Sequence, residues 1–143
     1  MLWLGHAGTA RVALAVGMTA PFLWWAQRLA PWTRAAIGAA LFAMGLWASA
    51  AWSAATGLVD DGRIVVDEVA GAALVLFVLR PKRPSIAAAV LVAYVAIDRL
   101  KPWPVSLAES IPGAFGVMLD DIAAAGLAVV LALLGRLVLR RLG

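Results

Sequence analysis

The chain is organised around the stretch Asp98-Arg99-Leu100-Lys101-Pro102-Trp103-Pro104. After a short polar loop it is followed by Gly116-Val117-Met118-Leu119-Asp120-Asp121-Ile122-Ala123-Ala124-Ala125-Gly126. Together the two segments place three carboxylates and a lysine in an otherwise apolar sequence. Ionisable groups at membrane depth are costly, and by default they mark functional sites. Asp67 and Glu68 lie in a similar apolar setting upstream. The chemistry is therefore expected among these five acids.

The composition indicates a membrane protein with one domain, residues 1–143. The chain is 64% hydrophobic and its mean hydropathy is +0.95, far above a soluble globular protein. It has no cysteine, which excludes disulfides, thiolate metal sites and cysteine nucleophiles, and His6 is its only histidine. The net charge is +4, but the basic residues cluster at the ends of apolar runs. That pattern is typical of membrane flanking and argues against nucleic-acid binding.

Five apolar runs predict an all-α integral membrane bundle of about five helices, two of them short. The third and fourth runs have about 15 residues each, roughly 22 Å of helix, which is short for a hydrocarbon core of about 30 Å. The runs cover residues 9–29, 35–56, 64–79, 85–100 and 114–139.

If all five runs cross the membrane, the loops alternate between its two sides. All eight acidic residues then fall on one side: Asp60, Asp61, Asp67, Glu68, Asp98, Glu109, Asp120 and Asp121. Eight of the twelve basic residues fall on the other: Arg28, Arg34, Arg80, Lys82, Arg83, Arg136, Arg140 and Arg141. We therefore expect distant acids to meet at one end of the bundle.

Four of these acids, Asp67, Glu68, Asp120 and Asp121, are candidate metal ligands. Acid pairs at helix starts can also be solvated caps favoured by the helix dipole. Clustered carboxylates, however, repel one another and must be protonated, paired with cations or bound to metal. With one histidine and no cysteine the ligands are hard oxygens, which suit Mg²⁺ or Mn²⁺. Asp98 is a candidate further ligand or orienting base.

Lys101 is a candidate phosphate-binding residue. Pro102 and Pro104 are expected to hold Lys101 and Trp103 in extended conformations, which makes a stiff strap beside the acids. Asp98 lies three residues earlier and can coordinate metal or orient the lysine. The alternative is a lysine that extends from a helix end toward the membrane surface.

Three blocks, residues 64–71, Lys101-Pro102-Trp103-Pro104 and residues 116–126, resemble the phosphatidylglycerophosphatase A family in order and approximate spacing. The resemblance implies a magnesium-dependent phosphatase of phospholipid biosynthesis. Its substrate would be a phosphorylated glycerolipid, phosphatidylglycerophosphate, which is hydrolysed to phosphatidylglycerol and phosphate at the bacterial cytoplasmic (inner) membrane. The five acids Asp67, Glu68, Asp98, Asp120 and Asp121 would be the catalytic residues.

The chain departs from the family pattern at several positions. Ala7-Gly8-Thr9 is similar to part of the family's Pro-Gly-Thr-x-Gly-Ser block, so Thr9 is either a helix N-cap or a phosphate-binding residue. Tyr94-Val95 stands where the family commonly has Phe-Arg, which leaves open whether the nearby Arg99 substitutes. Arg63 replaces a usual serine. These departures concern recognition of the headgroup more than the metal acids.

Two functions from other classes compete with the phosphatase. A small ion or proton carrier would use intramembrane acids, but carriers place their sites near the bilayer midplane. A structural membrane subunit would use its small-residue helices for packing alone. The oligomeric state, the number of metal ions, and the choice between water attack and an aspartyl-phosphate intermediate stay open. So does the membrane face of the site, because the positive-inside rule and the resemblance imply opposite orientations.

Overall fold

The computed structural model describes residues 3–58 and 64–142, and within these ranges it is all-α, as predicted. Five of its helices match the five apolar runs, and α5 is a short helix that falls in the predicted polar loop after Lys101. A helix this short shows no apolar periodicity, so the sequence pattern missed it. The helices are α1 (Trp3–Ala26), α2 (Pro31–Thr56), α3 (Val66–Leu79), α4 (Pro84–Leu100), α5 (Val105–Glu109) and α6 (Ala114–Leu142).

The helix boundaries have local causes. Pro31 and Pro84 stand in the first turns of α2 and α4, where a missing backbone N–H costs little. Three helices end at a residue in the left-handed conformation, whose backbone N–H bonds to the preceding turn. These caps are Gly57 after α2, Arg80 after α3 and Lys101 after α4.

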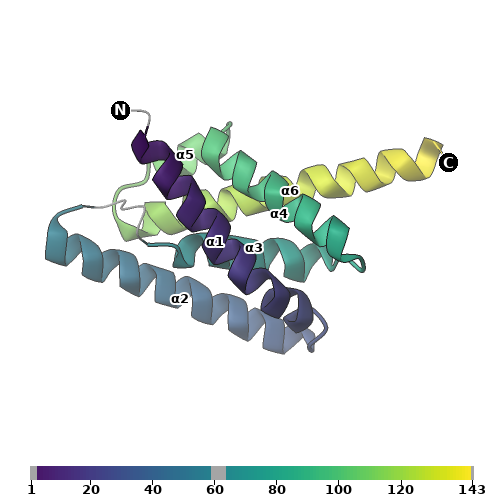
Figure 1. Ribbon diagram of the computed structural model, residues 1–143, viewed down its shortest axis with the longest axis horizontal. Coiled ribbons are helices and arrows are strands. Elements are labelled where there is room, and N and C mark those ends of the chain that lie inside the picture. The colour runs from purple at the N-terminus through teal and green to yellow at the C-terminus, as the bar shows by residue number, and fades with distance from the viewer. Residues whose placement is uncertain (1–2, 59–63, 143) are drawn as a thin grey trace.

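Two helices are long and apolar enough to cross a membrane, residues Pro31–Thr56 of α2 and Ala114–Arg141 of α6. The described apolar part of α1 is shorter, and α3 and α4 have 14 and 17 residues. Figure 1 shows the C-terminal part of α6 extending past the other helices. Two such helices fit a membrane protein, while the five-helix membrane bundle stays a prediction.

The short helix α3 is the centre of the bundle. It packs against α1, α2, α4 and α6, and Figure 1 shows it enclosed between them. Its small residues allow this close packing, since Ala72 and Ala73 are fully buried. At Gly71 a side chain would overlap the Tyr94 hydroxyl of α4, so only glycine lets these two helices approach.

The ends of the bundle differ in charge. The start of α3, the end of α4 and the start of α6 meet at the left end of Figure 1, and the end of α3 and the start of α4 lie at the right. We call these the acid end and the basic end. The acid end holds Asp67, Glu68, Asp98, Asp120 and Asp121. The expected contributions of Asp60, Asp61 and Arg63, and of the Glu109 side chain, lie outside the described residues.

Candidate active site

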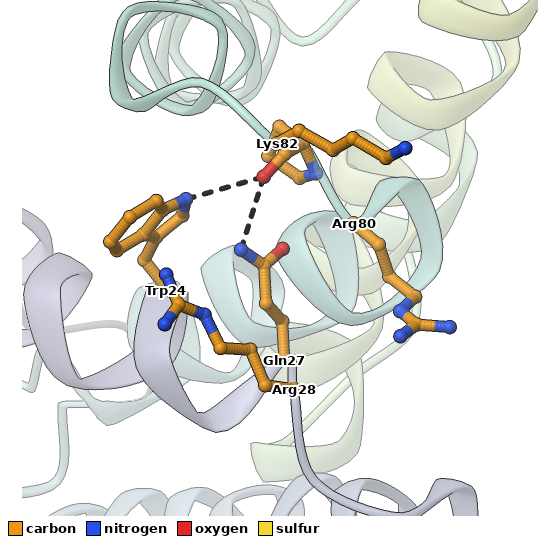
Figure 2. A pocket seen from close by; sticks show the side chains of 6 residues that line it. Trp24, Gln27, Arg28, Arg80 and Lys82 are labelled. Carbon is orange, nitrogen blue, oxygen red and sulfur yellow. Dashed lines mark hydrogen bonds between the residues drawn. The ribbon is translucent and has the colours of Figure 1, made fainter.

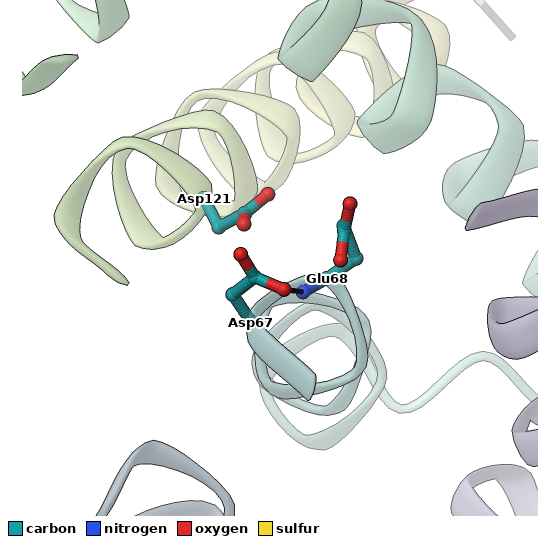
Figure 3. A group of neighbouring side chains, drawn as sticks. All are labelled: Asp67, Glu68 and Asp121. Atoms are coloured by element: carbon teal, nitrogen blue, oxygen red, sulfur yellow. Dashed lines mark hydrogen bonds between the residues drawn. The ribbon is translucent and has the colours of Figure 1, made fainter. Parts of the chain in front are cut away.

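Three carboxylates meet where α3 and α6 cross at the acid end (Figure 3). Asp67 and Glu68 come from the first turn of α3, and Asp121 comes from α6. Each offers a carboxylate oxygen, and these three oxygens lie within 4.8 Å of one another. The exposed fractions are only 5%, 7% and 4%. This is the geometry of a group that can hold a metal ion.

Tyr94 of α4 positions one of these acids. Its hydroxyl donates to Asp121 Oδ1 at 2.9 Å and lies 3.2 Å from the backbone carbonyl of Glu68. Because residues four apart share a helix face, Tyr94 stands one turn before Asp98 on the side that faces the acids. The sequence interpretation treated Tyr94 only as a departure from the family pattern. Its spacing from Asp98 in an apolar helix was the signal that could have identified it.

Backbone N–H groups stabilise two of the carboxylates. The N–H of Glu68 donates to Asp67 Oδ1 at 3.1 Å, and the N–H of Asp121 donates to Asp120 Oδ1 at 2.8 Å. Asp67 and Glu68 also lie at the N-terminus of α3, where the helix dipole favours negative charge. The fold therefore supports negative charge at this point.

The support for Glu68 is incomplete. Its Oε2 atom is buried and accepts no hydrogen bond from the described residues. A divalent cation between Asp67, Glu68 and Asp121 would give this oxygen a partner and remove the repulsion.

Lys101 lies beside the group, but its backbone differs from the prediction. Its Nζ donates to Asp120 Oδ2 at 2.8 Å. The expected extended conformation is wrong, because Lys101 has φ 44° and ψ 51° and caps α4 through a hydrogen bond from its N–H to the Ile97 carbonyl. A left-handed residue also avoids the right-handed helical region that the following Pro102 disfavours. The peptide bond between Trp103 and Pro104 is cis.

Asp120 and Asp98 lie beside the three-carboxylate group with their own basic partners. Asp120 faces Lys101, so its predicted role as a metal ligand stays a prediction. Arg99 Nε is 3.8 Å from Asp98 Oδ2, and Arg99 Nη2 is 3.6 Å from Glu68 Oε1. The guanidinium of Arg99 thus reaches the acids. This position agrees with the idea that Arg99 substitutes for the arginine that the family commonly has where this chain has Val95.

Thr9 is not an N-cap, because α1 begins six residues earlier at Trp3. Its side chain lies outside the described part of the chain, so its phosphate-binding role stays a prediction.

The fold and the site together define an all-helical protein, with two helices that fit a membrane protein, whose buried carboxylates can hold a metal ion beside a lysine. Residues 2–136 match the model of the family described as phosphatidylglycerophosphatase A, and the chain belongs to this family. Membership implies a phosphatase of lipid metabolism. Neither the curated proteins nor the solved structures contain a match to the chain.

Proposed function

We propose that the protein hydrolyses phosphatidylglycerophosphate to phosphatidylglycerol and phosphate with the help of Mg²⁺, or of Mn²⁺ in its place. The observation that carries this proposal is the group Asp67, Glu68 and Asp121, buried and converging within 4.8 Å, in a chain of this family. Mg²⁺ in proteins binds one or two carboxylates together with waters and phosphate oxygens. The donors present fit that ion.

The proposed role of Lys101 is to bind the substrate phosphate. Its ammonium group is half-buried at the edge of the carboxylate group and is held there by Asp120. An ammonium is a compact point charge. Such a charge suits a phosphoryl oxygen, on which negative charge grows during the reaction.

In the reaction, a water oxygen attacks phosphorus and the bond from phosphorus to the terminal glycerol oxygen breaks. That oxygen takes a proton and becomes the hydroxyl of phosphatidylglycerol. A bound Mg²⁺ would polarise the phosphoryl group and lower the pKa of the attacking water. Tyr94 keeps Asp121 aimed at the other acids, and Asp98 is a further ligand or the base that orients the water. An aspartyl-phosphate intermediate is the alternative pathway.

The test measures phosphate release from phosphatidylglycerophosphate by purified protein in detergent. Activity is expected to disappear in excess EDTA and to return with Mg²⁺ or Mn²⁺. Undiminished activity in EDTA would contradict the metal assignment. An ion carrier or a structural subunit would release no phosphate under any of these conditions. Phosphatidic acid as a second substrate would measure how far the glycerol headgroup is recognised.

A further inference from the structure

A pocket lies at the basic end of the bundle, away from the carboxylates. It has a volume of about 450 Å³ and lies between the end of α1 and the segment that joins α3 to α4. Figure 2 shows the side chains around it. They are Trp24, Gln27, Arg28, Arg80, Pro81 and Lys82.

The pocket is built by specific contacts. The Pro81 carbonyl accepts hydrogen bonds from Trp24 Nε1 at 3.2 Å and from Gln27 Nε2 at 3.1 Å, as Figure 2 shows. These bonds hold the segment between α3 and α4 against α1. The guanidinium of Arg28 stacks over the Trp24 ring at 4.7 Å. The walls are therefore held in place by the fold.

Three basic side chains, Arg28, Arg80 and Lys82, surround the pocket and are exposed. Among the described residues none of them pairs with a carboxylate. Several cations around one hollow produce a positive field that attracts an anion. A phosphate group is the anion that arginine and lysine bind best at a membrane surface.

The side chain of Gln27 indicates that a ligand of this pocket carries a hydrogen-bond donor. The residue is only 5% exposed, and its Oε1 atom is buried without a partner among the described residues. In Figure 2 this oxygen points away from the Pro81 carbonyl, toward the side on which Arg80 and Lys82 extend. An amide oxygen can only accept, so its natural partner is a hydroxyl or another donor on the ligand.

An apolar groove between α1 and α4 continues from the pocket. Two further hollows of about 270 and 410 Å³ share Gly17, Ala20, Ala88 and Leu91, and the smaller one shares Trp24 with the basic pocket. The groove follows α1 from Trp24 to Ala13. At 1.5 Å per residue this is about 16 Å, close to half of a hydrocarbon core of about 30 Å.

We propose that the basic pocket and this groove form a binding site for an anionic glycerophospholipid with a hydroxyl-bearing headgroup. The phosphate lies among Arg28, Arg80 and Lys82, a headgroup hydroxyl donates to Gln27 Oε1, and one acyl chain lies along α1 and α4. The charges select the anionic headgroup and the length of the groove fits one leaflet. This site is independent of the carboxylate site.

The first test uses native mass spectrometry of the protein in detergent with an equimolar mixture of dioleoyl-phosphatidylglycerol and dioleoyl-phosphatidylcholine. The wild type is expected to retain the anionic lipid several-fold more. Arg28→Gln together with Lys82→Gln should reduce this preference about three- to tenfold, on the scale of two exposed ion pairs. The matched control, Arg140→Gln with Arg141→Gln, removes the same charge at the end of α6 and should keep it. Equal adducts in the wild type, or an equal effect of the control, would overturn the proposal.

The second test separates a lipid from a free anion. A Cβ atom at Gly17 would meet no atom within 4 Å, so a leucine there extends into the groove, and Gly17→Leu should reduce the adducts of both lipids severalfold. Gly135 of α6 also faces open space, and Gly135→Leu is the control for the change of a helical glycine. Unchanged adducts in Gly17→Leu would contradict the acyl-chain assignment. Complete displacement of the lipid by millimolar inorganic phosphate would also contradict it, because the pocket would then be an anion site alone.

The third test concerns Gln27 and the place of binding. Dioleoyl-phosphatidylmethanol has the same phosphodiester charge but no headgroup hydroxyl, and it should bind about two- to tenfold more weakly than phosphatidylglycerol, as expected for one hydrogen bond. Equal retention would refute the role of Gln27. Lys101→Met should leave the preference for phosphatidylglycerol intact. If it removes the adduct, the lipid lies at the acid end and the proposed site is wrong.

Discussion

The two ends of the bundle place their charged side chains in opposite environments. At the acid end five carboxylates are buried, and three of them converge on one point. At the basic end Arg28, Arg80 and Lys82 remain exposed around a hollow. Buried like charges need a bound cation or protons, whereas exposed charges keep their water and stay available to an anion.

The central helix α3 connects these two ends. Its N-terminal first turn carries Asp67 and Glu68, and the carbonyls of its last turn accept hydrogen bonds from Arg34 and Arg136. Acids at the N-terminus and bases at the C-terminus both complement the helix dipole. At the C-terminus of α3 the arginines act as caps, which is a structural role. At the N-terminus, more carboxylates cluster than capping of the helix requires, which indicates a functional role.

The largest expected effect is at Asp121. Asp121→Asn keeps an oxygen to accept from Tyr94 but removes one charge from the carboxylate group, so phosphate release should fall at least about 10²-fold, the scale of a lost electrostatic group in a reaction site. The metal-free mutant should melt at the same or a higher temperature, since a repulsion is relieved. Stabilisation by Mg²⁺, about 2.7 kcal/mol at an ion concentration 100 times Kd, should shrink. Melting curves with and without the ion measure both effects.

A structural acid cluster would give the reverse pattern for this mutant. Asp121→Asn would then melt earlier without Mg²⁺, and its response to the ion would equal that of the wild type. That result would remove the functional contrast between the two ends.

The next effect is at Lys101. Lys101→Met should lower kcat/KM by an amount that corresponds to a loss of about 2–4 kcal/mol of transition-state stabilisation. Lys101→Arg should keep part of the activity. Lys101 could bind the phosphate or only neutralise Asp120. The double mutant Lys101→Met with Asp120→Asn distinguishes these two roles, because it removes both charges of the pair. A phosphate-binding lysine predicts that the double mutant stays as slow as Lys101→Met. Recovery of activity in the double mutant would mean that Lys101 serves only to balance Asp120. Arg140→Met is the control for the loss of one positive charge.

A smaller effect, confined to stability, is expected at the C-terminal end of α3. Arg34 Nη1 donates to the Phe77 carbonyl at 2.6 Å from a partly buried position. Arg34→Met should lower the free energy of unfolding by about 1.5–3 kcal/mol, the range for a hydrogen bond to a charged group. Well below the melting temperature, phosphate release and the response to Mg²⁺ should equal those of the wild type. A changed Mg²⁺ response would show that the two ends are coupled through α3.

The smallest effect is expected at Tyr94. Tyr94→Phe keeps the ring that packs on Gly71 and removes only the hydroxyl, so it should cost about 1 kcal/mol of stability. Because Asp121 loses the group that aims it, the apparent Kd for Mg²⁺ should rise severalfold and kcat should fall by a similar factor. Titration of activity against Mg²⁺ measures both. An unchanged ion affinity would reduce Tyr94 to a packing residue.

Much of this arrangement follows from the sequence alone. Apolar runs and their prolines determine the five helices that match those runs, because hydrophobic length and helix-breaking residues act locally. Alternation of antiparallel helices then predicts that Asp67, Asp98 and Asp120 meet at one end. The oxygen-only inventory of acids, with no cysteine, predicts a hard divalent cation such as Mg²⁺ or Mn²⁺. The motifs around Lys101 and Asp120 identify the family, which the match over residues 2–136 confirms.

Only the tertiary structure decided which side chains meet. Whether Asp120 or Asp121 faces Asp67 depends on the rotation of α6 about its own axis, and neighbouring helical residues point about 100° apart. The packing of α6 against α3 and α4 determines that rotation, and it turns Asp121 to the carboxylates and Tyr94, and Asp120 to Lys101. The roles of Tyr94 and Arg99 depend on the same contacts. So does the basic pocket, which exists because Trp24 and Gln27 bind a carbonyl more than fifty residues away in the chain.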